Sequence, residues 1–288
     1  MDEHAAIMPE RFNSIPMTTY STIDDLDTFF NEQAQKIINR SSTHQYAVVR
    51  KLPWDVYDRI ESRTFTTAIR TSYNYETGDM IVKLMPGQEH EAPHLEFAMT
   101  VRMRLERMGV SEDDILSIGA ARHMGFLWTK EADSSLKPLP ARERRVDWPA
   151  FVVECGISES LDRLHTGAEW WLSNSDGAVK LVVLISFDLR HQFFHIETWE
   201  MRALQIERQR TESVSCELRL NQYPPAPTRT KTISIELQGN GGPFVASDDL
   251  TIKFRNVMLR DPIPPETDIH LTRNDLQRWA MRIVSGLK

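Results

Sequence analysis

The segment 179–187 constrains the fold more than any other part of the sequence. It is apolar at nearly every position, which is typical of a strand that is buried on both faces of a sheet. Such a strand needs covering layers above and below it. The segment 161–172 supplies one layer, because its apolar residues recur at helical spacing, and 193–199 alternates like a neighbouring strand. The sequence therefore predicts an α/β core with a mixed sheet flanked by helices.

The regions on either side of this core show simpler patterns. Apolar residues at helical spacing predict a helix over 24–39, with Thr22 as a weak capping residue. A turn at 76–79 joins two strand-like runs and predicts a β-hairpin. Beyond residue 203 we expect an antiparallel β extension and a terminal helix. The strands predicted in the hairpin and in the extension cover 64–75, 80–85, 213–220, 232–237 and 250–258.

These patterns divide the chain into three predicted parts. Residues 1–44 hold an irregular leader, placed at 1–20, and the first amphipathic helix. Residues 45–203 form the main domain, and residues 204–288 form the C-terminal β extension with its helix.

The composition excludes several classes of protein. With 41% apolar and 26% charged residues, the 288-residue chain is an ordinary globular mix and not a disordered one. Its two cysteines, Cys155 and Cys216, are too few for a disulfide framework or a cysteine zinc cluster and favour a reducing compartment. Neither a long apolar run nor an apolar signal segment is present, so we expect an intracellular protein, cytoplasmic or nuclear, with no membrane partner. The net charge of -7 argues against a general nucleic-acid coat protein.

Residues 90–94 read His-Glu-Ala-Pro-His, which matches the HExxH letters of zinc metalloproteases. That chemistry requires both histidines on one face of a continuous helix. Pro93 lies inside the pattern, and a proline in a helix interior removes a donor and clashes with the preceding turn. We therefore expect His90 in a loop, a helix that starts near Pro93 and ends at Gly109, and no metalloprotease activity.

Two carboxylates, Asp133 and Glu154, form a more informative pair. Glu154 directly follows the apolar run 151–153, and Asp133 lies in a predicted strand or sheet edge. A carboxylate beside a buried strand is costly unless it is paired or binds a cation. Two such groups on adjacent strands can hold a hard divalent ion through their oxygens. The alternative is that Glu154 forms a structural ion pair with a nearby arginine.

Several motifs follow one another between about residues 55 and 200. The hairpin reads Tyr-Glu-Thr-Gly-Asp-Met-Ile-Val-Lys-Leu-Met-Pro over 75–86, and His90 and a helix come next. Asp133 then precedes Pro-Ala-Phe-Val-Val-Glu-Cys-Gly-Ile-Ser-Glu-Ser over 149–160, and Trp-Trp-Leu over 170–172 leads to the apolar strand. In this order the motifs resemble the Uma-type family of endonuclease-like proteins in the PD-(D/E)XK nuclease superfamily. Ala132 stands where that family usually has a proline.

The resemblance implies a restriction-endonuclease-like core and metal-dependent hydrolysis of phosphodiester bonds in DNA. Asp133 and Glu154 would bind Mg²⁺ or Mn²⁺, and the backbone carbonyl of Cys155 would add a ligand. Glu76 would be an outer carboxylate of the catalytic set, and His90 would face the same cleft.

One departure from the family pattern concerns the catalytic lysine. The superfamily places it two residues after the glutamate, where this chain has Gly156. Lys180, which we include in the predicted catalytic set, and Lys137 are substitutes. Arg163 in the following helix is a poor replacement if a proton must leave, because a guanidinium does not deprotonate. The departure keeps a second hypothesis open, in which a catalytically inactive nuclease-like fold binds nucleic acid or protein.

The predicted partners follow from the basic residues and from the C-terminal strands. Arg142, Arg144 and Arg145 cluster between the two carboxylates and would grip DNA phosphates, together with His90 and Arg163; the alternative is a solvated surface. A third hypothesis is a plain interaction protein that offers the strands of 213–258 to a protein partner. A homodimer is a further expectation.

Overall fold

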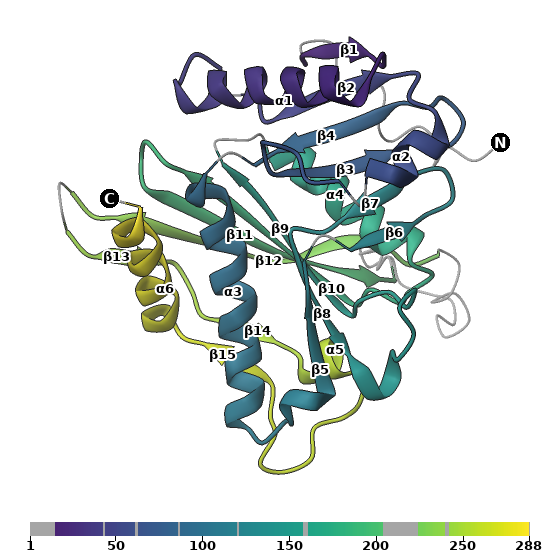
Figure 1. Cartoon of the computed structure of the whole chain (residues 1–288). Coiled ribbons are helices and arrows are strands. Elements are labelled where there is room, and N and C mark those ends of the chain that lie inside the picture. Colours follow the sequence, from purple (N-terminus) through teal and green to yellow (C-terminus); the bar gives the residue numbers. More distant parts are fainter. Residues whose placement is uncertain are drawn as a thin grey trace, which may run out of the picture.

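The computed structural model describes residues 15–42, 44–60, 63–85, 87–119, 121–157, 161–203, 224–239 and 242–287. Within them, a seven-stranded sheet and a four-stranded sheet organise the fold (Figure 1). The helices are α1 (Ile23–Ile38), α2 (Trp54–Ile60), α3 (Gln88–Arg107), α4 (Leu161–Asn174), α5 (Phe254–Met258) and α6 (Arg273–Gly286). The strands are β1 (Met17–Thr19), β2 (Tyr46–Arg50), β3 (Ile69–Tyr73), β4 (Met80–Leu84), β5 (Ile115–Ile118), β6 (Arg122–Met124), β7 (Thr129–Glu131), β8 (Ser134–Pro138), β9 (Phe151–Ile157), β10 (Leu181–Asp188), β11 (Phe193–Arg202), β12 (Ala226–Leu237), β13 (Phe244–Ala246), β14 (Leu250–Ile252) and β15 (Ile269–Leu271).

The larger sheet has the order β13-β12-β11-β10-β9-β8-β5. Strand β10 runs parallel to β9 and antiparallel to β11, so the predicted mixed sheet is confirmed. Strand β12 pairs antiparallel with β11 from Phe193↔Glu236 to Arg202↔Ala226, with a β-bulge at Thr198/Trp199. The described part of the C-terminal region therefore continues the central sheet and ends in the predicted helix, α6. The boundaries at 44 and 203 remain predictions.

Helices cover both faces of the larger sheet. Figure 1 places α3 and α6 side by side along one face, where their apolar residues pack with Phe151, Val153 and the β10 side chains that point the same way. Helix α4 covers the opposite face and packs on Val152 and Leu184. The apolar segment predicted to be central is thus buried on both sides, as expected for a strand between two helical layers.

The smaller sheet has the order β1-β2-β4-β3 and packs on α1 and α2. The predicted hairpin is confirmed, because β3 and β4 pair antiparallel from Tyr73↔Met80 to Ile69↔Leu84. The predicted cap of α1 is also confirmed, because the Thr22 side chain accepts a hydrogen bond from the Asp25 amide at 3.2 Å.

Two predicted elements differ from the structure. Residues 17–19, predicted as irregular leader, form β1 and pair in parallel with β2. A strand was predicted over 250–258. In the structure the strand β14 ends at residue 252, and α5 begins at Phe254. Phe254, Val257 and Met258 are buried at helical spacing, and Asp268 accepts a hydrogen bond from the first helical amide, that of Phe254, at 2.9 Å. The predicted strand 213–220 and Cys216 lie outside the described residues.

The largest difference concerns the start of α3. This helix begins at Gln88 and runs through Pro93, so the prediction that His90 lies in a loop is wrong. Pro93 is the sixth helical residue, and it removes only the bond that its amide would have made to the Glu89 carbonyl. His90, His94 and other residues of the same helix are buried, so tertiary packing outweighs the local cost of the proline. The helix ends beside Gly109, as predicted, where the backbone φ is +100°.

Among the residues that the structure describes, no helix combines the length and the apolar character needed to cross a membrane.

Candidate active site

Strand β9 places Glu154 on the face of the larger sheet that α4 covers. Successive side chains of a strand point to opposite faces, so Glu154 follows Val152 to the α4 side, while Val153 and Cys155 point to the α3 side. Trp171 of α4 donates its Nε1–H to Glu154 Oε1 over 2.5 Å. The carboxylate is therefore held beneath a helix by a specific donor.

Asp133 lies at a bend directly before β8, which pairs antiparallel with β9. Ser134 faces Val153 in that register, so the preceding Asp133 reaches the level of Glu154 and Cys155. Asp133 Oδ2 accepts a hydrogen bond from the Cys155 amide at 2.8 Å. The two sequence-predicted carboxylates and the predicted backbone ligand thus meet at one place in the fold.

A lysine from the smaller sheet completes this cluster. Lys83 of β4 donates from Nζ to Asp133 Oδ2 at 2.6 Å and to the Cys155 carbonyl at 2.5 Å. Its Nζ lies 4.0 Å from Glu154 Oε2. Asp133, Glu154 and Lys83 are only 1%, 3% and 5% exposed. The ammonium therefore contacts the same three groups that the sequence assigned to a metal ion.

Lys130 of β7 adds a second ammonium to the cluster. Its Nζ lies 3.1 Å from Glu154 Oε1, the oxygen that also accepts from Trp171. The two buried carboxylates therefore face two ammonium groups. Opposite charges at such distances attract each other more strongly in a poorly solvated site than in water.

Burial and neighbouring charges shift the pKa values of Asp133 and His90. Burial raises the pKa of Asp133, but Lys83 and, to a smaller extent, His90 and His94 lower it by more, so the pKa of this carboxyl lies below its ordinary value. Burial and, to a smaller extent, the nearby Lys83 ammonium lower the pKa of the His90 imidazole to about 3. At neutral pH the cluster therefore holds an ionised Asp133 beside a neutral His90.

The hydrogen bonding of Asp133 is incomplete. Oδ2 accepts two hydrogen bonds, but Oδ1 is buried and has no hydrogen-bond partner within the described part of the chain. A buried carboxylate oxygen without a hydrogen-bond donor is costly and points to a partner other than the described residues. The atoms that could bind a metal ion here belong to two carboxylates and a backbone carbonyl. They are oxygen ligands of the kind that Mg²⁺ and Mn²⁺ prefer. The residues present therefore fit a hard divalent ion.

The structure does not bring the predicted substitute lysines to this place. The Lys180 amide bonds the Ala150 carbonyl at 2.8 Å, which sets Lys180 before the start of β10, and its exposed ammonium contacts the carbonyl of Gly177. Leu184, four residues further along, is the residue that pairs with Glu154. Lys137 bonds the Arg144 carbonyl at 3.0 Å. The prediction that Lys180 completes the catalytic set is therefore wrong, because the strand register displaces it along the sheet.

Glu76 lies apart from the cluster, whereas Arg163 contacts a neighbour of Lys83. Glu76 is exposed in the turn of the β3–β4 hairpin, where Asn74 Oδ1 accepts a hydrogen bond from its amide. Lys83 lies near the other end of β4, so the structure does not support Glu76 as an outer ligand. Arg163 stacks over the Tyr46 ring of β2 at 5.1 Å, and Tyr46 is the residue that pairs with Lys83 in the register of β2 and β4.

The predicted arginine cluster lies in the loop that joins β8 to β9. Arg144 and Arg145 are exposed, and Arg144 pairs with Asp147 at 3.3 Å. Arg142 is half-buried and donates to the Ala178 carbonyl at 3.4 Å. The loop ends at the start of β9, about 10 Å along the strand from Glu154. Its arginines therefore flank the cluster and do not enter it.

Sequence reasoning missed Lys83, Lys130 and the donor role of Trp171. A signal for Lys83 was present, because it is the one charged residue in the apolar run 80–85. A lysine is rarely buried unless it is paired, so its place in that run indicates a buried anionic partner. Lys130 has no comparable signal, since it lies in a polar stretch and reaches Glu154 only through the folding of β7.

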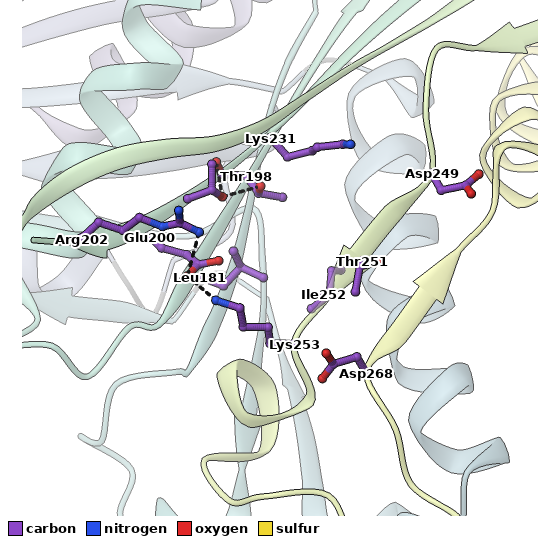
Figure 2. Close-up of a pocket in the computed structure, with 11 residues that line it drawn as sticks. Leu181, Thr198, Glu200, Arg202, Lys231, Asp249, Thr251, Ile252, Lys253 and Asp268 are labelled. Carbon is purple, nitrogen blue, oxygen red and sulfur yellow. Dashed lines mark hydrogen bonds and ion pairs between the residues drawn. The ribbon is translucent and has the colours of Figure 1, made fainter. Parts of the chain in front are cut away.

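A separate cavity of about 270 Å³ lies where β10–β12 approach β14 and β15 (Figure 2). Glu200 in its lining contacts two other charged lining residues, Lys253 at 3.3 Å and Arg202 at 4.0 Å. Of the described residues that line it, none belongs to the cluster around Asp133.

Comparisons with known proteins give a distant structural likeness. No protein-family model matches the chain, and no curated protein matches it. The fold is similar to the crystal structure of a candidate nuclease of the DUF820 family from Anabaena variabilis, with 14% sequence identity and a TM-score of 0.40. The similarity covers 73% of this chain and 90% of the other.

Proposed function

We propose that this protein hydrolyses phosphodiester bonds in DNA with the help of a divalent ion, Mg²⁺ or Mn²⁺. The observation that carries the proposal is the meeting of Asp133, Glu154, the Cys155 carbonyl and Lys83, which come from three separate segments. Burying two carboxylates and a lysine together is rarely the most stable choice for a core. Perturbed titratable groups in such a cluster are instead typical of functional sites.

Asp133, Glu154 and the Cys155 carbonyl would hold the ion. When bound, it would lower the pKa of a coordinated water and offset negative charge on the phosphate. Asp133 Oδ1 supports this assignment, because it is buried and has no hydrogen-bond partner among the described residues.

The other residues of the cluster have supporting roles in the proposed reaction. The superfamily carries its catalytic lysine two residues after the glutamate, and Lys83 takes over that role here. Its ammonium stabilises negative charge that develops on the phosphate oxygens. To do so, it must exchange its contacts with Asp133 and Cys155 for contacts with the substrate. Trp171 and Lys130 fix the position of the Glu154 carboxylate. Arg144 and Arg145 would contact DNA phosphates beside the site.

A plasmid assay tests the proposal. Purified protein is incubated with supercoiled DNA and with Mg²⁺ or Mn²⁺ over a range of salt. We expect nicking by the wild type, loss of nicking in Lys83→Met, and unchanged nicking in Lys180→Met. The matched pair compares the buried lysine of the cluster with the exposed lysine beside Gly177. Intact plasmid with both ions at every salt concentration contradicts the proposal.

A second function, non-catalytic binding of nucleic acid or protein, is favoured by a different observation. Two ammonium groups already balance two carboxylates, and Lys83 lies between the groups that would hold an ion. Calorimetry with Mn²⁺ separates the two functions. A hydrolase binds the ion and loses that binding in Glu154→Gln, whereas a binding module takes up no Mn²⁺ at this cluster but retains salt-sensitive DNA binding or a protein partner.

A further inference from the structure

Helix α3 carries a second group of side chains suited to an ion. His90, Glu91 and His94 occupy positions i, i+1 and i+4 of one continuous helix. One ligand atom from each of the three lies within 4.8 Å of the others. Since positions i and i+4 lie on the same face of a helix, the continuity of α3 through Pro93 is what brings the two imidazoles together. Their ring centroids are 5.8 Å apart.

The two imidazoles are buried with nitrogens that lack partners. His90 is 1% exposed, and within the described residues neither of its ring nitrogens has a hydrogen-bond partner. His94 is fully buried, and its Nε2 likewise has no hydrogen bond there, although Glu91 Oε2 lies 3.5 Å away. Buried polar atoms of this kind destabilise the folded state when they stay unsatisfied. Several of them in one place indicate a bound group.

We propose that His90, Glu91 and His94 bind one divalent transition-metal ion such as Zn²⁺. Two imidazole nitrogens and one carboxylate oxygen suit Zn²⁺ or Co²⁺, whereas Mg²⁺ and Ca²⁺ prefer sites made of oxygen alone. Three protein ligands leave a fourth position for water. This site differs in chemistry from the oxygen site of Asp133 and Glu154, and it does not depend on the proposed hydrolysis.

The surroundings of the three residues agree with this assignment. His94 Nδ1 forms a hydrogen bond with Ser134 Oγ at 2.8 Å, which orients the ring and leaves Nε2 for the ion. Ligand atoms around a tetrahedral Zn²⁺ lie about 3.4 Å apart, given bonds of about 2.1 Å. The Glu91 Oε2–His94 Nε2 separation of 3.5 Å is close to this value, and the ligand atoms of all three residues lie within 4.8 Å of one another.

Charge and access also favour an ion at this point. Asp133 lies near both histidines and adds negative charge, while Lys83 and Arg70, whose Nη2 is 3.9 Å from Glu91 Oε1, oppose it. Glu91 is half-buried and lines a groove of about 630 Å³ between α3 and α6. An ion can therefore reach the buried imidazoles from solvent by way of Glu91.

Metal titration of the full chain tests the inference. Tag-free protein is freed of metal with a chelator and titrated with Zn²⁺ in a calorimeter and with Co²⁺ in a spectrophotometer. We expect one ion per chain and the visible absorption of four-coordinate Co²⁺. Glu91→Gln should weaken Zn²⁺ binding by at least about tenfold, while Glu89→Gln on the same helix should leave it unchanged. No Zn²⁺ binding by the wild type, or equal affinity in Glu91→Gln, overturns the inference.

Two further variants exclude other locations for the ion. His90→Gln with His94→Gln should abolish the Co²⁺ spectrum, and circular dichroism verifies that this variant folds; if it does not fold, Glu91→Gln decides. Glu154→Gln should retain Zn²⁺ binding. If Glu154→Gln loses Zn²⁺ while Glu91→Gln retains it, the ion sits at the oxygen site and the inference is wrong. Since binding is the readout, this result is independent of DNA cleavage.

Discussion

Two buried carboxylates in this protein, Glu197 and Asp133, differ in how completely their oxygens are hydrogen-bonded. Glu197 of β11 is fully buried, and each of its oxygens accepts two hydrogen bonds. The four donors, at 2.8–2.9 Å, are His165, His195, Trp199 and Arg229. Asp133 is equally buried, yet its Oδ1 has no hydrogen-bond partner among the described residues while its Oδ2 accepts two bonds.

This difference separates a structural carboxylate from one that is available for chemistry. A carboxylate with every acceptor position occupied has nothing left for a ligand, so Glu197 joins α4, β11 and β12 and does no more. A carboxylate with an unused oxygen, held beside a second carboxylate and a lysine, keeps the capacity to bind. We therefore expect damage to Glu197 to affect stability alone and damage to the cluster around Asp133 to affect both stability and activity.

The largest effect is expected from removing one charge at each site. Asp133→Asn leaves the buried Lys83 without its main counter-charge, and breaking a buried ion pair costs about 3–5 kcal/mol of unfolding free energy. Cleavage of DNA should also fall by at least about a hundredfold. Glu197→Gln should lower the unfolding free energy but leave cleavage per folded molecule unchanged. Urea unfolding measures the stability and plasmid nicking measures the cleavage. Equal cleavage by the two variants would contradict the distinction between a structural Glu197 and a functional Asp133.

A smaller effect is expected from two matched tryptophans. Trp171 donates to Glu154 at 2.5 Å, and Trp199 donates to Glu197 at 2.8 Å. Phenylalanine at either position keeps most of the packing but removes the donor, and a hydrogen bond to a charged group contributes about 1.5–3 kcal/mol. Both variants should lose stability by this amount in urea unfolding. Only Trp171→Phe should slow DNA cleavage, and a slower Trp199→Phe contradicts the assignment of Glu197 as purely structural.

The pH dependence of stability sharpens the description of Glu197. Despite its burial, hydrogen bonds from His195, Trp199 and Arg229 lower the pKa of Glu197 from its ordinary value of 4.5 to about 2. A lowered pKa in the folded state means that the stabilisation is complete above pH 4.5 and disappears as the pH falls towards 2.

The difference in unfolding free energy between the wild type and Glu197→Gln should therefore shrink over this interval, by at most about 1.4 kcal/mol for each pH unit. Denaturant unfolding at pH 2–6 measures it. A difference that stays constant over this range shows that Glu197 is not the titrating group.

The smallest effect is expected in the arginine loop. Arg145 is exposed and lies outside the cluster, so Arg145→Ala should change the unfolding free energy by less than about 0.5 kcal/mol. If it contacts a phosphate, DNA binding should weaken and the dependence of affinity on salt should become shallower by about one unit of slope. Fluorescence anisotropy at several salt concentrations measures the DNA affinity and its dependence on salt. An unchanged slope would show that Arg145 does not contact DNA.

Much of the fold was predictable because its signals are local. The buried strand β10, the β3–β4 hairpin and the amphipathic helices each follow from apolar periodicity within one segment. The structure also brings together Asp133, Glu154 and Cys155, which the order of the sequence motifs had marked as candidate ligands, and their role as ligands stays a prediction.

The remainder depended on contacts between distant segments. Lys83 belongs to the other sheet, and its contact with Asp133 spans fifty positions in the sequence. Lys180 was predicted wrongly because register along β10, which periodicity does not define, moves it away from Glu154. Pro93 was misleading for a related reason, since burial of His90 and His94 against the rest of the fold outweighs its local cost.

The most direct test of the central claim is single-turnover hydrolysis of a labelled DNA duplex in the presence of Mn²⁺, measured for the wild type and for Glu154→Gln. Product should form with the wild type, increase with the Mn²⁺ concentration until the site is saturated, and be absent with Glu154→Gln. Equal rates for the two proteins, or no product from folded wild type at any Mn²⁺ concentration, would contradict the claim that these buried carboxylates form a hydrolytic site.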